Sequence, residues 1–334
     1  MKKIKITAVL LIIVMLFCTA CGKSGTANTA NAAENTNEKK EENKSSEEDN
    51  GLEEENNEEV NLVIGEMPQT GKTNRIPREY LTDAAEQGKL DSTAYDAVDY
   101  SNDNKIVRKC VRIYLPYGYD PDDKETKYNV VYLMHGFPGN TSTFLNEIPM
   151  KNILDNMIEK GDIKPAIFVF PTYNDFTFED FPRDFTENLI PLIETMYNTY
   201  LEDATPEGII ASRDHRVYGG FSVGAMTAWN VFLKASECVR YFMPMADIPA
   251  ETDPASVVDS LIKEKKLDEQ GYFIFHMCGS DEGSFCRDFA KDMIDKGYTA
   301  DHYVFYERGG GVHEYVDVQD YIYTALPVIL GDME

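Results

Sequence analysis

The chain has 334 residues and a formal net charge of −26, from 58 acidic and 32 basic side chains. This charge argues against a nucleic-acid-binding protein, because contacts to phosphate groups need a basic surface. It also argues against substrates that are strongly anionic polymers, because like charges repel each other.

The first 21 residues are predicted to be a secretory signal. Three lysines begin it, an apolar core runs from residue 6 to residue 17, and small residues precede Cys21. This core is too short for a comfortable membrane span. The junction between Ala20 and Cys21 is similar to a bacterial lipoprotein signal, so we expect a lipid on Cys21 as the only membrane contact. An ordinary cleaved signal with an incidental cysteine is the alternative.

Residues 22–66 are predicted to be a disordered acidic tether. The segment is rich in Asn, Glu, Lys, Ser and Thr and has few large apolar side chains. It therefore cannot bury enough apolar surface to offset the entropy lost on ordering. Residues 67–334 are then expected to form one domain. With a lipid at Cys21, the sequence predicts an extracellular domain held close to the cell membrane.

Apolar, β-branched runs alternate with amphipathic helical patterns through this domain. Such alternation is typical of an α/β fold with a mainly parallel, doubly wound sheet and helices on both faces. Ligands of these sheets bind beyond the carboxyl ends of the strands. The predicted strands are residues 107–115, 130–134, 166–170, 216–218, 241–245, 272–277 and 302–306, and the main predicted helices are 152–159, 185–200, 225–234 and 285–296.

The clearest catalytic motif is the G-x-S-x-G sequence formed by Gly220, Ser222 and Gly224. It follows a predicted strand and precedes a predicted helix, the context in which this motif forms a nucleophile elbow. Glycine lacks the Cβ atom that would clash in so tight a turn. We therefore predict Ser222 as a nucleophile.

A serine nucleophile needs a base within hydrogen-bond reach and an acid that orients the base. Of the five histidines, His313 alone follows the carboxyl end of the last predicted strand, after three consecutive glycines. Asp281, after strand 272–277, is the predicted acid and gives the chain order Ser, Asp, His. Asp247, after the preceding strand, is the rival acid. The adjacent Glu282 is expected to point away.

The sequence His135-Gly136-Phe137 ends the predicted strand 130–134. In this position we expect an oxyanion hole formed by the backbone N–H groups of Phe137 and Val223. A buried turn without a catalytic role is the alternative.

Aromatic side chains follow strand 166–170, at the edge where a substrate would bind. Tyr173, Phe176 and Phe178 are candidates to stack on a phenolic acyl group or a sugar, and Phe181 belongs to the same loop. The alternative is that they pack the loop onto the domain. Trp229, on the helix after the elbow, is expected in the core. No C-x-x-C or H-E-x-x-H pattern occurs, so neither a metal nor another cofactor is expected.

Taken together, these motifs make the chain resemble the carbohydrate esterases that include feruloyl and acetyl xylan esterases. This group is the esterase-D-like branch of the α/β hydrolases, and the resemblance extends from about residue 77 to residue 330. The segments that carry it are VRIYLPYG (111–118), YLMHGFPGN (132–140), NILDNMIEKGDIKPAIFVFP (152–171), YGGFSVGAM (218–226) and GGGVHEY (309–315).

The resemblance implies an α/β-hydrolase fold and removal of feruloyl or acetyl groups from plant-wall polysaccharide such as xylan. The reaction would pass through an acyl-enzyme formed by Ser222, His313 and Asp281. The family also contains hydrolases of siderophore esters, so another small ester remains an alternative. So does a non-catalytic carbohydrate-binding protein at the cell surface. Val223 departs from the family's frequent Met and is expected to reshape the acyl pocket.

Overall fold

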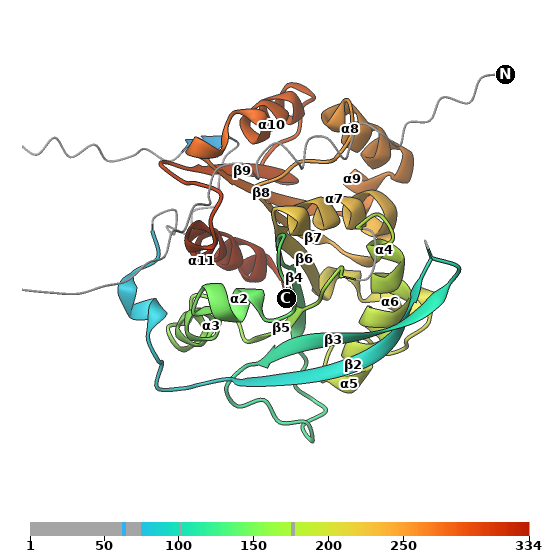
Figure 1. Cartoon of the computed structure of the whole chain (residues 1–334), viewed down its shortest axis with the longest axis vertical. Helices are drawn as coiled ribbons and strands as arrows, with labels where there is room; N and C mark the ends of the chain where they lie inside the picture. Colours follow the sequence, from blue (N-terminus) through green and yellow to red (C-terminus); the bar gives the residue numbers. More distant parts are fainter. Residues whose placement is uncertain (1–61, 65–74, 101, 175–177, 334) are drawn as a thin grey trace, which may run out of the picture. The chain divides into compact units, whose positions relative to one another are not determined.

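The computed structural model describes residues 62–64, 75–100, 102–174 and 178–333 (Figure 1). The predicted signal with Cys21, most of the predicted tether and Phe176 lie outside the described residues.

One nine-stranded sheet forms the centre of the described fold, with the strand order β1-β9-β8-β7-β6-β4-β5-β3-β2. The six strands β9, β8, β7, β6, β4 and β5 run parallel to their neighbours in this group. The pairs β1–β9, β3–β5 and β2–β3 are antiparallel. The predicted mainly parallel sheet is therefore confirmed. The strands are β1 (Leu62–Ile64), β2 (Lys89–Asp99), β3 (Lys105–Leu115), β4 (Asn129–Met134), β5 (Ala166–Phe170), β6 (Arg216–Phe221), β7 (Tyr241–Met245), β8 (Phe273–Gly279) and β9 (Tyr303–Arg308).

The first strand, β1, corrects one predicted boundary. Residues 62–64 pair with β9, Val63 lying opposite Tyr306. The prediction that the tether continues to residue 66 is wrong for these three residues. The apolar sequence Leu-Val-Ile covers an edge of the sheet that would otherwise present unpaired backbone groups.

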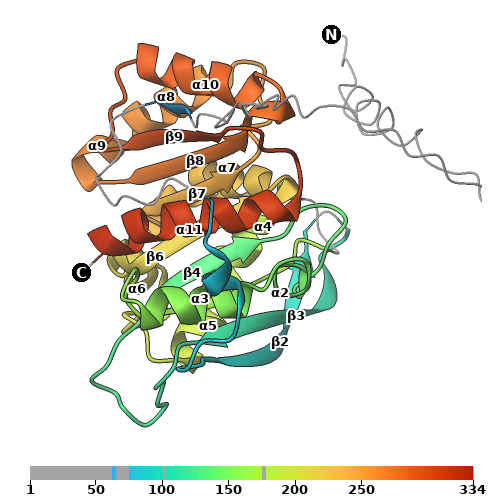
Figure 2. The same ribbon diagram turned by 90° about the vertical axis from the view of Figure 1, so that its left-hand side faces the viewer.

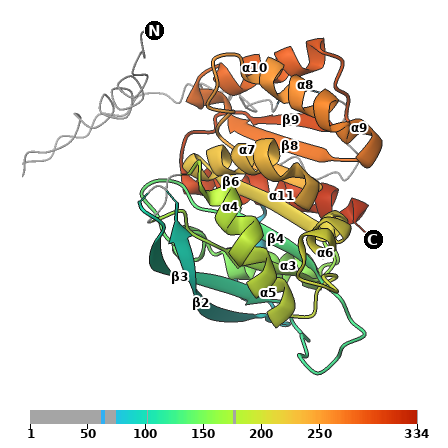
Figure 3. The same cartoon turned by 90° about the vertical axis from the view of Figure 1, so that its right-hand side faces the viewer.

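Helices cover both faces of the sheet, as predicted. Helices α2, α3 and α11 lie over one face (Figure 2), and α4 to α8 and α10 lie on the other side (Figure 3). The helices are α2 (Thr143–Glu147), α3 (Met150–Glu159), α4 (Phe181–Asp184), α5 (Ile190–Met196), α6 (Pro206–Ala211), α7 (Val223–Ala235), α8 (Pro254–Lys265), α9 (Leu267–Gln270), α10 (Phe285–Asp295) and α11 (Tyr315–Asp332), with short turns η1 (Arg78–Leu81), η3 (Arg213–His215), η4 (Ser236–Cys238) and η5 (Ser280–Glu282).

The predicted helix 185–200 has a different form in the structure. A π-helical segment, η2 (Phe185–Leu189), joins α4 to α5, and the Ile190 N–H bonds to the Phe185 carbonyl. Pro191 follows with no N–H to donate, which breaks the regular α-helical pattern. The helix ends at Met196, because Tyr197 is extended with φ −120° and ψ 165°. The prediction that it reaches residue 200 is wrong.

A buried ion pair fixes the elbow strand at the end opposite Ser222. Arg216, the first residue of β6, is fully buried, and its Nη2 donates to Glu194 Oε2 of α5 at 2.7 Å. The same guanidinium donates to the Ile209 and Cys238 carbonyls at 2.8 and 2.7 Å. A buried charge needs this degree of pairing, because an unpaired one is strongly destabilising. Trp229 of α7 is 1 % exposed, so its predicted place in the core is confirmed.

Candidate active site

Ser222 lies in a sharp turn between β6 and α7. Its backbone has φ 57° and ψ −123°, a conformation that is strained for a residue with a side chain. A Cβ atom at Gly224 would overlap the Met134 carbonyl oxygen, and one at Gly220 would overlap the Gly224 carbonyl oxygen. The two glycines of the motif are therefore needed for close backbone packing. The Ser222 N–H donates to the Met245 carbonyl at 2.9 Å, which fixes the turn against β7.

His313 lies in the loop between β9 and α11. Its Nδ1 forms a hydrogen bond with the Glu282 carboxylate, and its ring packs on Phe221 with 4.7 Å between centroids. Phe221 directly precedes Ser222, so the imidazole lies beside the elbow. Because Nδ1 is engaged by Glu282, Nε2 is the nitrogen left to act on a hydroxyl. The hydrogen bond to Glu282 is the main cause that raises the pKa of His313 above its usual value.

Glu282, rather than Asp281, is the acid beside the histidine. Its side chain is 1 % exposed, and Oε1 also accepts from the Gly279 N–H at 2.8 Å and the Tyr321 hydroxyl at 3.3 Å. Asp281 is exposed, and its carboxylate accepts from the Ser280 hydroxyl at 3.0 Å. The prediction that Asp281 contacts the histidine and Glu282 points away is therefore wrong. Both residues lie in the 3₁₀ turn η5, where successive side chains point about 120° apart.

Asp247, the rival acid, also lies close to this pair. Its charge contributes to the raised pKa of His313, although less than Glu282 does. Asp247 follows Ala246, which is buried with φ 64°, an unusual conformation for a residue other than glycine. Trp229 Nε1 donates to the Asp247 carbonyl at 3.0 Å. Burial raises the pKa of the Asp247 carboxyl to about 6.

The other histidines have structural partners. His276 is fully buried, and its Nδ1 lies 2.8 Å from the Tyr303 hydroxyl. His215 Nδ1 lies 2.8 Å from Asn129 Oδ1, and His302 Nδ1 lies 3.1 Å from a backbone carbonyl. His135 is engaged at both ring nitrogens, by the Gly136 carbonyl and the Thr172 hydroxyl, so His313 is the histidine that is free to act at the elbow.

The loop after β4 brings its backbone against the nucleophile. A Cβ atom at Gly136 would lie 3.2 Å from Ser222 Cβ. The Gly136 carbonyl accepts from His135 Nδ1 at 2.8 Å, so the His135 Nε2 accepts from the Thr172 hydroxyl, also at 2.8 Å. Burial lowers the pKa of His135, which favours this neutral form.

The two amides predicted for the oxyanion hole flank this contact. Phe137 follows Gly136, and its side chain is 71 % exposed while its backbone stays in the loop. Val223 is the first residue of α7, where a backbone N–H has no acceptor within the helix. A helix N-terminus also favours negative charge.

A second network holds the histidine loop. Arg308, at the end of β9, is 6 % exposed and pairs with Asp317 at 3.0 Å and Asp320 at 2.7 Å, both on α11. Asp317 Oδ2 accepts from the Val312 N–H at 2.7 Å. The Asp281 N–H donates to the Gly311 carbonyl at 2.9 Å. The loops that carry the acid and the histidine are thus joined by their backbones.

The aromatic side chains that follow β5 differ in their burial and contacts. Phe181 is fully buried and stacks on Phe185, so it packs the domain. Tyr173 is 8 % exposed and packs on His135 with 4.8 Å between ring centroids. Its hydroxyl has no hydrogen-bond partner within the described part of the chain. Phe178 is half-buried.

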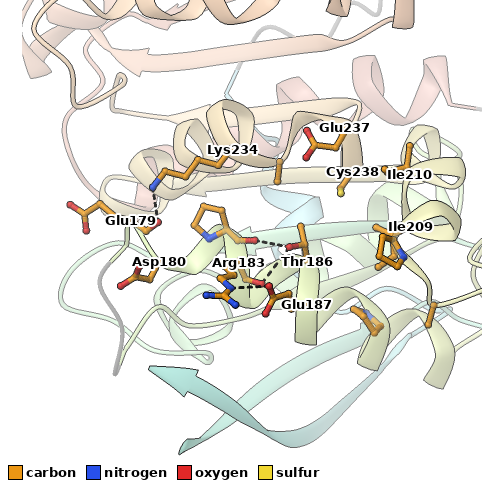
Figure 4. Close-up of a pocket in the computed structure, with 15 residues that line it drawn as sticks. Glu179, Asp180, Arg183, Thr186, Glu187, Ile209, Ile210, Lys234, Glu237 and Cys238 are labelled. Atoms are coloured by element: carbon orange, nitrogen blue, oxygen red, sulfur yellow. Dashed lines mark hydrogen bonds and ion pairs between the residues drawn. The ribbon is translucent and has the colours of Figure 1, made fainter. Parts of the chain in front are cut away.

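A separate cavity of about 690 Å³ lies among α4, η2, α5, α6 and the end of α7 (Figure 4). At its mouth, Arg183 pairs with Glu187 at 2.8 Å, and Lys234 Nζ donates to the Glu179 carbonyl at 2.7 Å. Its lining contains none of the residues described above at the elbow.

Within the ranges that the structure describes, no group of three or more His, Cys, Asp or Glu side chains is arranged to hold a metal ion. No helix in these ranges has the length and apolar character needed to cross a membrane.

A nucleophile elbow after a central parallel strand, with a histidine after the last strand, defines an α/β hydrolase. The comparisons with known proteins agree. The Esterase family model matches residues 107–249. A feruloyl esterase module from Clostridium thermocellum, solved as a serine-to-alanine mutant with sinapinate, is 34 % identical. The match covers 78 % of this chain and 94 % of that one, with a TM-score of 0.71.

Further relatives are longer or more distant. Endo-1,4-beta-xylanase Y of Acetivibrio thermocellus is 36 % identical over 267 residues, which are 75 % of this chain and 24 % of that protein. The chain therefore spans about a quarter of this relative. A ferulic acid esterase of Anaeromyces mucronatus, 17 % identical with a TM-score of 0.59 over 81 % of this chain and all of that one, shares the fold. The chain belongs to the esterase family of α/β hydrolases that contains the feruloyl esterases.

Proposed function

We propose that this esterase removes feruloyl-type acyl groups from plant-wall xylan, with Ser222 as nucleophile, His313 as base and Glu282 as acid. The proposed substrate is supported by the 34 % identity with a feruloyl esterase module whose structure contains sinapinate. The proposed roles of the three residues are supported by the hydrogen bond between His313 and Glu282 beside the elbow.

In the proposed reaction, Ser222 Oγ attacks the ester carbonyl carbon while its proton passes to His313 Nε2. The N–H groups of Phe137 and Val223 hold the oxyanion, and Glu282 stabilises the imidazolium. As the intermediate collapses, the imidazolium protonates the leaving sugar oxygen. Water then attacks the acyl-enzyme, again giving a proton to His313, and the carboxylic acid leaves as Ser222 recovers its proton.

The acyl group is proposed to lie against Tyr173, Phe178 and the exposed Phe137 ring. Phe176, which lies outside the described residues, remains a candidate for the same role. Aromatic faces of this kind suit a phenolic ring. We propose no metal and no cofactor for the reaction.

Acid release from feruloylated and acetylated xylan oligosaccharides tests the substrate, with an enterobactin-type siderophore ester measured in parallel. The proposal expects kcat/KM to be largest for the feruloylated oligosaccharide, and Ser222→Ala to abolish turnover of all three while the protein stays folded. Faster cleavage of the siderophore ester would favour that alternative instead. Retention on immobilised xylan without hydrolysis of any ester would favour a carbohydrate-binding protein.

We also propose that the chain is exported and held at the outer face of the cell membrane by a lipid on Cys21. The basic and apolar start of the chain and the Ala20-Cys21 junction support this proposal. Incorporation of radiolabelled palmitate into the wild-type chain, and its loss in Cys21→Ala, is the expected result. Equal labelling of both proteins would contradict the proposal.

A further inference from the structure

Tyr315 connects three parts of the active site that are far apart in the sequence. It is the first residue of α11 and lies two residues after His313. Its hydroxyl accepts a hydrogen bond from the Gly136 N–H at 2.8 Å, across 179 residues of sequence. Its ring packs on Phe221, the residue before the nucleophile, with 5.0 Å between centroids, and on Phe144 of α2 with 5.7 Å.

This hydrogen bond controls the part of the loop that presents the Phe137 amide. The peptide unit between Gly136 and Phe137 contains the Gly136 carbonyl and the Phe137 N–H, which point in opposite directions in a trans peptide. His135 Nδ1 donates to that carbonyl at 2.8 Å. Tyr315 holds the Gly136 N–H, one peptide unit earlier. Gly136 is therefore fixed at both of its polar backbone groups, and the direction of the Phe137 N–H follows from them.

The position of the same glycine matters for catalysis because it touches the nucleophile. A Cβ atom at Gly136 would lie 3.2 Å from Ser222 Cβ and 3.2 Å from the Phe221 carbonyl oxygen. Gly136 thus lies close against the elbow, and loss of the Tyr315 hydrogen bond removes a restraint on its position. An oxyanion-hole donor must lie 2.7–3.1 Å from the developing charge, so a small shift has a large effect on the rate.

We propose that Tyr315 is a positioning residue whose hydroxyl orients the oxyanion loop and joins it to the helix that follows His313. The inference rests on the proposed serine-esterase mechanism. The phenol is suited to this role, because burial raises the pKa of Tyr315 to about 12 and keeps the hydroxyl neutral at the pH of catalysis. It acts through Gly136 and does not need to touch the substrate.

Tyr315→Phe removes the hydroxyl and keeps the ring contacts. The matched control is Tyr197→Phe, which also removes one hydroxyl hydrogen bond, to Asp91 Oδ2 at 2.9 Å, outside the active site. Three quantities are measured for each protein with p-nitrophenyl acetate: kcat, KM, and the inhibition constant of phenylboronic acid, which forms a tetrahedral adduct with a serine nucleophile. Because p-nitrophenyl acetate is an activated ester, its kcat measures the stabilisation of the oxyanion whatever acyl group the natural substrate contains.

For Tyr315→Phe, we expect kcat to fall about 10- to 100-fold, KM to stay within about two-fold, and the boronic acid inhibition constant to rise by a factor similar to the loss in kcat. Tyr197→Phe is expected to keep all three values. Reversible partial unfolding would raise KM and the inhibition constant by the same factor, and an irreversibly inactive fraction would lower the apparent kcat alone, so neither produces this pattern.

An unchanged kcat would overturn the inference, and so would a loss of kcat with an unchanged inhibition constant. A rise in KM alone would also overturn it and would place Tyr315 in substrate binding. The proposed function fails by a different result, full activity of Ser222→Ala or the absence of feruloyl release by the wild-type enzyme. The two failures are therefore distinguishable.

Discussion

Replacement of Glu282 by Gln tests the acid that the structure places beside His313. The substitution preserves the shape of the side chain. The amide oxygen can still accept a hydrogen bond from the Gly279 N–H, which lies 2.8 Å from Glu282 Oε1 in the wild-type chain. It removes the negative charge that binds the imidazole Nδ1. An amide can also donate to Nδ1, which would leave the imidazole in the tautomer that has its proton on the wrong nitrogen.

The expected loss is large because the carboxylate is 1 % exposed and water cannot replace it. In serine hydrolases of this kind, the neutral amide at the acid position lowers kcat by about 10²- to 10⁴-fold, which is about 3–5 kcal/mol of transition-state stabilisation. The pH profile should change as well. Glu282 is the main cause of the raised pKa of His313, and the base acts when neutral. Glu282→Gln should therefore lower the pKa of His313 and move the acid limb of the pH profile of kcat/KM to lower pH.

The assay is the pH dependence of p-nitrophenyl acetate hydrolysis by the wild type, Glu282→Gln and Asp281→Asn. Asp281→Asn is the matched control, because it changes an adjacent carboxylate that is exposed and binds Ser280. It should retain activity within about three-fold, as expected for a surface charge. An equal loss of activity in Asp281→Asn and Glu282→Gln would contradict the role of Glu282, and so would a Glu282→Gln enzyme that keeps more than about a tenth of the wild-type kcat.

Two further predictions concern charge and close packing. Asp247→Asn should move the acid limb of the pH profile of kcat/KM to lower pH, but by less than Glu282→Gln does, because Asp247 contributes less to the raised pKa of His313. An acid limb at the wild-type pH would show that the charge of Asp247 does not affect the imidazole. Gly224→Ala should lower the free energy of unfolding by about 1–3 kcal/mol or more, because the new Cβ overlaps a backbone carbonyl. Gly331→Ala, in α11 with open space around the new Cβ, should leave it unchanged or raise it by up to about 1 kcal/mol, and equal urea midpoints for the two variants would contradict the packing argument.

Much of the sheet could be predicted from the sequence, because the central strands are buried on both faces. Ala166–Phe170 and Tyr241–Met245 are continuous apolar runs, and the observed strands have the predicted bounds. Edge strands were harder. β2 has many exposed residues with mixed polarity, so it lacks the apolar pattern of a strand, although it pairs with β3 along its whole length. Its stability comes from backbone pairing with a neighbour, which a local pattern does not show.

The proposed nucleophile Ser222 and base His313 could be located from the sequence because each follows the carboxyl end of a strand. The acid could not be assigned in this way, because two carboxylates follow β8 and the choice depends on one turn. A usable signal was present in the spacing of Gly279 and Glu282. An acidic residue three positions after the residue that caps a helical turn often accepts a hydrogen bond from the backbone N–H of the capping residue. Glu282 does so with Gly279, which precedes the turn η5. That hydrogen bond directs the carboxylate inward and leaves Asp281 outside.

Tyr315 illustrates a limit of a different kind. Its place at the end of the segment GGGVHEY, two residues after His313, does not reveal this role, which arises from a hydrogen bond to Gly136 in a distant loop. A single sequence contains no direct record of such a contact. The structure is needed wherever the function of a side chain depends on two loops that meet only in the folded chain.

The backbone explains why these loops can meet with the precision that catalysis needs. The end of each central strand is hydrogen-bonded to the next strand: the Ser222 N–H to the Met245 carbonyl at 2.9 Å, and the Ala246 N–H to the Met277 carbonyl at 2.7 Å. The acid loop then binds the histidine loop through the Asp281 N–H. Ser222, Glu282 and His313, the proposed nucleophile, acid and base, therefore lie in segments connected by main-chain bonds that continue the sheet. The strain at Ser222 persists because these bonds leave the turn no relaxed alternative.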